Sequence, residues 1–168
     1  MTASMSRKVL IVEDEPELLT LMADSFRRAD IEVYTAGNGE VGLEMFRAVR
    51  PDLVITDIVM PAKEGVALIM DIKKTGIDTQ VIAISGGGAR ACKDYLRWAK
   101  ELGAALVLQK PFRMSILLMM ARFLMEKAAA RAGPVQSIPA LVAACGGAAA
   151  DPFDDLFEEP LGSPASTL

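Results

Sequence analysis

The sequence contains no histidine and only two cysteines, Cys92 and Cys145. A catalytic triad that uses histidine, a zinc site with histidine ligands and a phosphohistidine carrier are therefore excluded for this sequence. Two cysteines so far apart in the chain do not indicate a disulfide framework or a metal cluster. A metal site here would have to use oxygen ligands.

Long apolar runs are also absent. No run approaches the roughly 18 apolar residues that a membrane-spanning helix needs. Residues 1–8 are polar and lack the apolar segment of a signal peptide. We therefore expect a soluble cytoplasmic protein that does not bind a membrane.

The chain has no excess of basic residues, and its net charge is -4. All 18 Lys and Arg lie between Arg7 and Arg131, whereas five of the 22 Asp and Glu follow Gly133. Neither part of the chain has the basic surface that is typical of a DNA-binding module. We expect no nucleic-acid partner.

Composition divides the chain at about residue 132. Residues 1–132 are long enough to form one domain with its own core. Residues 133–168 are rich in Gly, Ala, Pro and Ser, and we predict that they form a disordered acidic tail. Within the tail, Asp151–Glu159 sets three large apolar residues among acids and could fold when bound to a partner, although disorder is favoured.

Apolar strand patterns alternate with helical patterns up to residue 132. Strands are expected at residues 9–12, 31–36, 53–57, 80–84 and 105–109, and helices at 16–28, 40–49, 64–74, 91–102 and 114–132. This alternation predicts an α/β fold, in which a doubly wound five-stranded parallel sheet is covered by five helices on its two faces. In the flavodoxin-like order 2-1-3-4-5, a crevice opens between the first and third strands.

Asp57 stands at the end of the central apolar run, just before Met60-Pro61. The carboxyl ends of parallel strands are where such sheets place their chemistry. The loop after the first strand brings Glu13 and Asp14 to the same crevice. Three carboxylates together repel one another unless a cation lies among them, and a site with oxygen ligands alone favours Mg²⁺.

Two further groups end the neighbouring strands. Ser85 follows the fourth strand, and Lys110 follows the fifth and precedes Pro111-Phe112. A hydroxyl and an ammonium group that face a metal-bound carboxylate are the groups needed to hold a phosphoryl group on Asp57.

On these residues, the chain from Lys8 to about Glu126 resembles the receiver domain of a two-component response regulator. It is most similar in organisation to a single-domain, chemotaxis-type receiver, here with a C-terminal extension. The matching motifs are Glu13-Asp14, Asp57-Ile58-Val59-Met60-Pro61, Ser85-Gly86 and Lys110-Pro111-Phe112. Each lies at a strand end and in the order of the family.

The resemblance implies that Asp57 accepts a phosphoryl group from a sensor histidine kinase or a histidine phosphotransfer protein. Glu13, Asp14, Asp57 and the Val59 carbonyl would hold Mg²⁺. Ser85, Lys110 and the backbone of Ile58 and Gly86 would contact the phosphate. Such a chain is a signalling receiver rather than an enzyme, catalyses only its own phosphotransfer and dephosphorylation, and switches the binding of a downstream protein that the sequence does not identify.

The sequence departs from the family pattern at three places. Glu13 replaces the commoner aspartate, and Val107 stands where receivers usually have an aromatic residue. Val59 and Gly87 occupy the positions that commonly orient a hydrolytic water, and neither has a polar side chain. Because Val59 and Gly87 lack polar side chains, we predict slow self-dephosphorylation. Because Val107 is not aromatic, we predict an altered coupling between Ser85 and the surface.

Two other functions remain open. One is an adaptor on the same fold that acts without phosphorylation. The other, more distant, is a small dinucleotide-binding protein, because Gly37-x-Gly39-x-x-Gly42 has the spacing of a dinucleotide fingerprint. Its place after the second strand, at the sheet edge, argues against a nucleotide site.

The last predicted helix is apolar on more than one face. Its large apolar residues are Met114, Ile116, Leu117, Leu118, Met119, Met120, Phe123, Leu124 and Met125. A fully buried helix is one explanation. We favour a protein contact, because methionine-rich surfaces adapt to partners: either the tail folded back or a homodimer through the fourth helix, fifth strand and fifth helix.

Overall fold

The computed structural model describes residues 7–60, 65–86 and 100–132. Its five strands form one parallel sheet in the order β2-β1-β3-β4-β5. The strands are β1 (Lys8–Val12), β2 (Glu32–Ala36), β3 (Leu53–Asp57), β4 (Gln80–Ser85) and β5 (Leu106–Gln109). The predicted strand order is confirmed, and β3 lies at the centre of the sheet.

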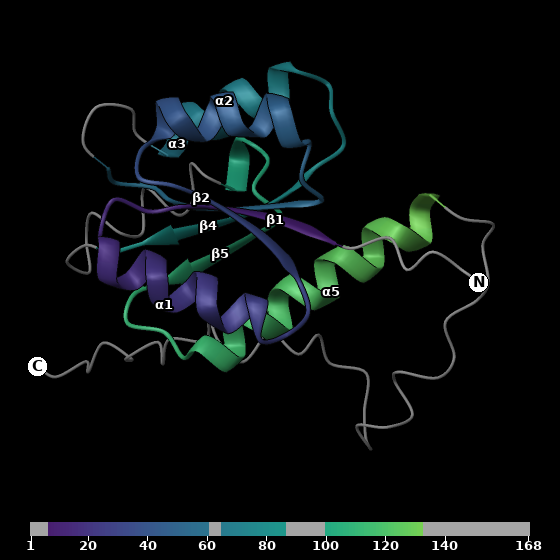
Figure 1. Cartoon of the computed structure of the whole chain (residues 1–168). Coiled ribbons are helices and arrows are strands. Elements are labelled where there is room, and N and C mark those ends of the chain that lie inside the picture. The colour runs from purple at the N-terminus through teal and green to yellow at the C-terminus, as the bar shows by residue number, and fades with distance from the viewer. Residues whose placement is uncertain (1–6, 61–64, 87–99, 133–168) are drawn as a thin grey trace, which may run out of the picture. The chain divides into compact units, whose positions relative to one another are not determined.

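Four helices within the described ranges cover the sheet. They are α1 (Pro16–Arg27), α2 (Gly39–Val49), α3 (Gly65–Lys74) and α5 (Met114–Ala132). Helices α1 and α5 lie on one face of the sheet, and α2 and α3 lie on the other (Figure 1). The helix predicted at 91–102 lies almost wholly outside the described residues, although residues 100–101 at its end are helical.

Local sequence determines where the first two helices begin. Helix α1 starts with Pro16, whose missing N–H is not needed at that position. Helix α2 is capped by Asn38, whose side-chain oxygen accepts a hydrogen bond from the Val41 N–H at 2.9 Å. Each helix starts within a few residues of the end of the preceding strand, so the loops at that edge of the sheet are short.

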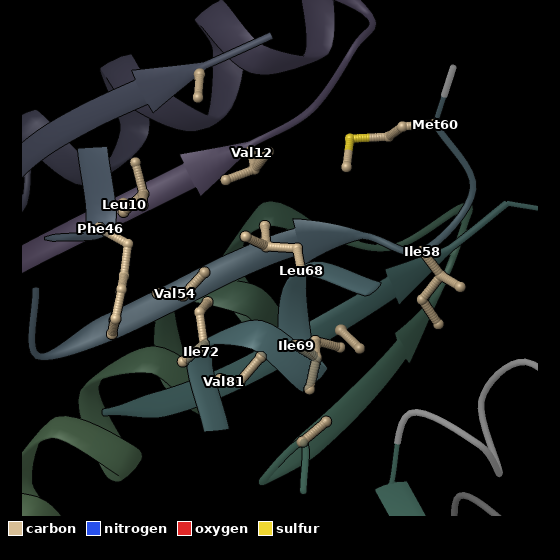
Figure 2. Packing of buried hydrophobic residues seen from close by; sticks show 13 residues of the cluster. Leu10, Val12, Phe46, Val54, Ile58, Met60, Leu68, Ile69, Ile72 and Val81 are labelled. Atoms are coloured by element: carbon tan, nitrogen blue, oxygen red, sulfur yellow. The ribbon is translucent and has the colours of Figure 1, made fainter. Parts of the chain in front are cut away.

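The core on the α2–α3 side is built from alternate strand residues and from one apolar side of each helix. In Figure 2, Leu68, Ile69 and Ile72 of α3 lie together with Val54 of β3 and Val81 of β4. All five side chains are fully buried. Because successive strand residues point to opposite faces, the intervening residues such as Ile55 and Ile82 face the α1–α5 layer. Helix α3 is therefore firmly anchored to the sheet beside the end of β3.

The glycine motif after β2 has a packing role. A Cβ atom placed on Gly42 would lie 3.0 Å from a methyl group of Val12 in β1. Strand β2 is at the end of the sheet, away from the crevice between β1 and β3. Close packing of α2 on β1 thus explains Gly42, and the fold gives no support to a dinucleotide site there.

Helix α5 buries one side and exposes another. Leu117, Met120 and Leu124 are buried, whereas Met119 is 53% exposed and Phe123 is 43% exposed. The explanation that the whole helix is buried is therefore wrong. None of the described helices is long and apolar enough to cross a bilayer.

By its backbone contacts the chain divides into residues 1–135 and 136–168. The described residues all belong to the first unit. The prediction of a tail at 133–168, and of its disorder, falls outside the described residues and stays a prediction.

Candidate functional site

Asp57 is the last residue of β3, a strand in which every residue is buried. Asp57 stands at the carboxyl end of the sheet, and the residue is 5% exposed. Its Oδ1 atom accepts a hydrogen bond from the Val59 N–H at 2.9 Å. The Asp57 carboxylate is therefore held on one side by the backbone of its own loop, and Oδ2 is left for other partners.

Lys110 supplies the positive charge. The Lys110 N–H donates to the Ser85 carbonyl at 2.8 Å, which fixes the lysine directly after β5. Its Nζ atom lies 2.6 Å from Asp57 Oδ2 and 2.9 Å from Glu13 Oε2. One ammonium group thus joins residues that are 53 and 97 positions away in the chain.

Glu13, Asp14 and Asp57 form the predicted acidic cluster. Each offers a carboxylate oxygen, and the three oxygens lie within 4.8 Å of one another. Glu13 and Asp57 are buried, whereas Asp14 is exposed. Hard oxygen donors on one exposed and two buried acids fit Mg²⁺, which binds proteins through a few carboxylates and retains several waters. The residues present therefore fit the metal that the sequence predicts.

The buried Glu13 and the partly buried Lys110 influence each other's protonation. Burial raises the pKa of Glu13, as does the negative charge of Asp57, and the hydrogen bond from Lys110 only partly offsets this. For Lys110, burial lowers the pKa, but the hydrogen bonds to Asp57 and Glu13 outweigh it, so that the pKa is raised. The ammonium group therefore keeps its proton firmly in the resting site.

The remaining predicted residues lie around Lys110 and Asp57. The Ser85 side chain is buried, and its Oγ atom has no hydrogen-bond partner. Gly86 lies against Lys110, since a Cβ there would be 2.9 Å from the lysine Cδ. The Ile58 N–H donates to the Ile84 carbonyl at 2.8 Å, and the Ile58 side chain is in the core. The proposed phosphate contacts of all three, and the metal contact of the Val59 carbonyl, stay predictions.

Two residues that lie close to Asp57, Thr56 and Gly65, are not indicated by the sequence pattern. The Thr56 hydroxyl donates to the Asp57 carbonyl at 3.0 Å. The Gly65 N–H donates to the Ile58 carbonyl at 2.9 Å, where α3 begins. The only sequence signal for Gly65 is a glycine at the start of a helix soon after Pro61, which by itself does not predict a contact with Asp57.

The sequence is similar to known proteins that contain receiver domains. Residues 9–122 match the family model described as the response regulator receiver domain. The chain is 31% identical to sporulation initiation phosphotransferase F of Bacillus subtilis over 108 residues, which cover 64% of this chain and 85% of that protein. It is 33% identical to the probable C4-dicarboxylate response regulator DctR of the same organism over 109 residues, or 64% of this chain and 47% of DctR.

Solved structures show the same fold. The N-terminal domain of an uncharacterized protein from Wolinella succinogenes superposes with a TM-score of 0.68 at 33% identity, covering 75% of this chain and 99% of that domain. Chemotaxis protein CheY4 of Vibrio cholerae superposes with a TM-score of 0.64 at 25% identity, covering 71% and 98%. The chain spans about half the length of several curated relatives that it matches.

Proposed function

Because this chain belongs to the response regulator receiver family, we propose that Asp57 accepts a phosphoryl group from the phosphohistidine of a sensor histidine kinase or a histidine phosphotransfer protein. The observation that carries the proposal is the Asp57 carboxylate, which is buried at a strand end with the Lys110 Nζ at 2.6 Å. Receiver domains are signalling modules rather than classical enzymes, and the proposed output is a change in protein binding.

The proposed transfer forms one bond and breaks another. A carboxylate oxygen of Asp57 attacks the phosphorus, the phosphorus–nitrogen bond of the donor breaks, and the ring nitrogen leaves with the electron pair. The donor departs as neutral imidazole when its second ring nitrogen carries a proton. Lys110, next to both Asp57 and Glu13, offsets negative charge as the phosphoryl group approaches. No strong base is needed, since the donor is already activated.

We propose that the reaction depends on Mg²⁺. Glu13, Asp14, Asp57 and the Val59 carbonyl would hold the ion, and its charge would offset that of the phosphoryl oxygens. Ser85 has a buried hydroxyl without a partner, which suits it to donate to a phosphate oxygen. The Gly86 N–H and the Ile58 backbone are the other proposed phosphate contacts.

We further propose that this receiver domain works in the cytoplasm as a switch of protein binding. The exposed Met119 and Phe123 of α5 support a protein contact on that helix, whether with a second copy or with a downstream protein. An adaptor that works without phosphorylation is the alternative on this fold.

The direct test is incubation with acetyl phosphate and Mg²⁺, followed by mass spectrometry of the intact protein. The wild type should gain the mass of one phosphoryl group, and Asp57→Asn should gain none. Omitting Mg²⁺ or adding a chelator should abolish the gain. A wild type that gains no phosphate under these conditions would favour the adaptor.

We also propose slow self-dephosphorylation. Val59 is 48% exposed beside the acceptor and has no polar group to orient an attacking water. Val59→Asn should shorten the half-life of the phosphorylated protein, whereas Val59→Ala should not. A wild-type half-life as short as that of fast chemotaxis-type receivers would contradict the proposal.

A further inference from the structure

The start of α3 lies unusually close to the phosphoacceptor. A Cβ atom built on Gly65 would lie 1.8 Å from the Asp57 carbonyl oxygen, 2.8 Å from the Asp57 carbonyl carbon and 3.0 Å from the Ile58 Cα. All three are backbone atoms, so a rotamer change cannot move them away. Only glycine fits this position as the two segments now lie.

Hydrogen bonds fix the same short stretch of backbone. The Gly65 N–H donates to the Ile58 carbonyl at 2.9 Å, and the Ile58 N–H donates to the Ile84 carbonyl of β4 at 2.8 Å. The Asp57 carbonyl itself accepts the Thr56 hydroxyl at 3.0 Å, and Thr56 is fully buried. The main chain that carries the acceptor is thus held from α3, from β4 and from its own strand.

Helix α3 cannot easily move aside. Leu68, Ile69 and Ile72 are fully buried against the sheet (Figure 2). A side chain at residue 65 would therefore have to displace the Asp57–Ile58 backbone, the first turn of α3, or both. Movement of the Asp57–Ile58 backbone changes where the Asp57 carboxylate lies relative to Lys110. Movement of the first turn of α3 breaks the Gly65–Ile58 hydrogen bond that holds this backbone.

We propose that Gly65 and Thr56 are positioning residues for phosphoryl transfer to Asp57. Gly65 lets the first turn of α3 close on the acceptor backbone, and Thr56 holds the Asp57 carbonyl against rotation. This inference rests on the proposed function, because it concerns the rate at which Asp57 is phosphorylated. The rate of phosphorylation would then depend on the position of the main chain around Asp57 as well as on the charged groups of the site.

The test measures phosphorylation by acetyl phosphate with saturating Mg²⁺ as a function of donor concentration. In this reaction an Asp57 oxygen binds the phosphorus, the donor's phosphorus–oxygen bond breaks and acetate leaves. A displacement of about 1 Å at a reacting group can lower a rate by on the order of 100-fold. We expect Gly65→Ala to lower the maximal rate roughly 10- to 100-fold, with the half-saturating donor concentration unchanged.

Two controls separate positioning from stability. Gly37→Ala adds the same methyl group where no atom lies within 4 Å, so it should leave the phosphorylation rate unchanged. Ile72→Val loosens the packing of α3 without a change beside Asp57, so it should lower the midpoint of thermal unfolding but leave the rate unchanged. A wild-type rate in folded Gly65→Ala would overturn the inference, as would an equal loss of rate in Ile72→Val.

The Thr56 variants keep the inference testable if Gly65→Ala does not fold. Thr56→Val has nearly the same shape without the hydroxyl and should be about fivefold slower, as expected for one net hydrogen bond. Thr56→Ser restores the donor and should recover the rate. A wild-type rate in Thr56→Val would overturn the role of Thr56. If Gly65→Ala also fails to fold, that result would overturn the whole inference. A wild type that takes up no phosphate at all overturns the proposed function itself.

Discussion

Every residue of β3 is buried, whereas no residue of β5 is. Strand β3 carries Asp57, and strand β5 leads into Lys110. The two oppositely charged groups of the site therefore come from very different surroundings. Strand β3 lies between β1 and β4, and β5 is an end strand of the sheet. Packed backbone thus fixes the position of Asp57, whereas ion pairs with Asp57 and Glu13 hold the side chain of Lys110.

Val107 belongs to the same contrast. It lies in β5, is only partly buried, and packs at the border of the core cluster. An aromatic residue at this position would offer a large ring that can turn between core and surface, and valine offers no such movement. Val107 therefore cannot transmit a change at the site by turning a ring between core and surface.

The largest effect is expected from removal of the charge that joins the two strands. Lys110→Met should slow phosphorylation of Asp57 by acetyl phosphate roughly 100-fold, since loss of one preorganised electrostatic contact typically costs that much. Intact-protein mass spectrometry over time measures the rate. Lys100→Met, which removes an exposed lysine just before β5, is the matched control and should behave as the wild type. Equal rates in Lys110→Met and the wild type would contradict the proposed role of the lysine.

A second pair of variants tests the difference in packing directly. Val54 of β3 is fully buried and Val107 of β5 is partly buried, and both contact the same core cluster. Val54→Ala should lower the free energy of unfolding by about 2–3 kcal/mol and Val107→Ala by about 1 kcal/mol. Urea denaturation measures both. Similar losses in the two variants would show that β5 is as tightly packed as β3.

Much of this organisation could be predicted from the sequence because it follows from the order of strands and helices. Apolar runs that alternate with amphipathic helices require a parallel sheet, and the acids and the lysine stand at strand ends in the sequence. The structure brings Glu13, Asp14, Asp57 and Lys110 together as that alternation predicts. Their proposed roles in metal binding and phosphoryl transfer stay predictions.

Other features depend on distances that no sequence pattern encodes. Glu13 was expected to serve the metal, yet its carboxylate also reaches Lys110, a residue 97 positions away. That contact depends on the side-chain length of Glu13 and on the spacing of β1 and β5 across the sheet. The contact of Gly65 with Asp57 depends in the same way on the path of the backbone after β3.

The smallest predicted effect concerns β2, the other end strand, which is mostly only partly buried. Its side chains Tyr34 and Glu32 are joined by a hydrogen bond. The Tyr34 hydroxyl donates to the Glu32 carboxylate. This hydrogen bond, together with burial and the charge of Glu32, raises the pKa of Tyr34 above its ordinary value of 10.0. The folded state thus holds the phenol proton more tightly than the unfolded state. The resulting stabilisation is complete below pH 10.0 and is lost as the pH rises through the raised pKa.

Near-ultraviolet absorbance titration of the wild type minus Tyr34→Phe isolates this phenol. Its midpoint should lie above 10.0 and should fall toward that value in Glu32→Gln, because an amide oxygen lacks the negative charge that disfavours a phenolate. An unchanged midpoint in Glu32→Gln would show that the Glu32 carboxylate does not raise the pKa of Tyr34. The Tyr34–Glu32 hydrogen bond would then not contribute to the stability of end strand β2 above pH 10.0.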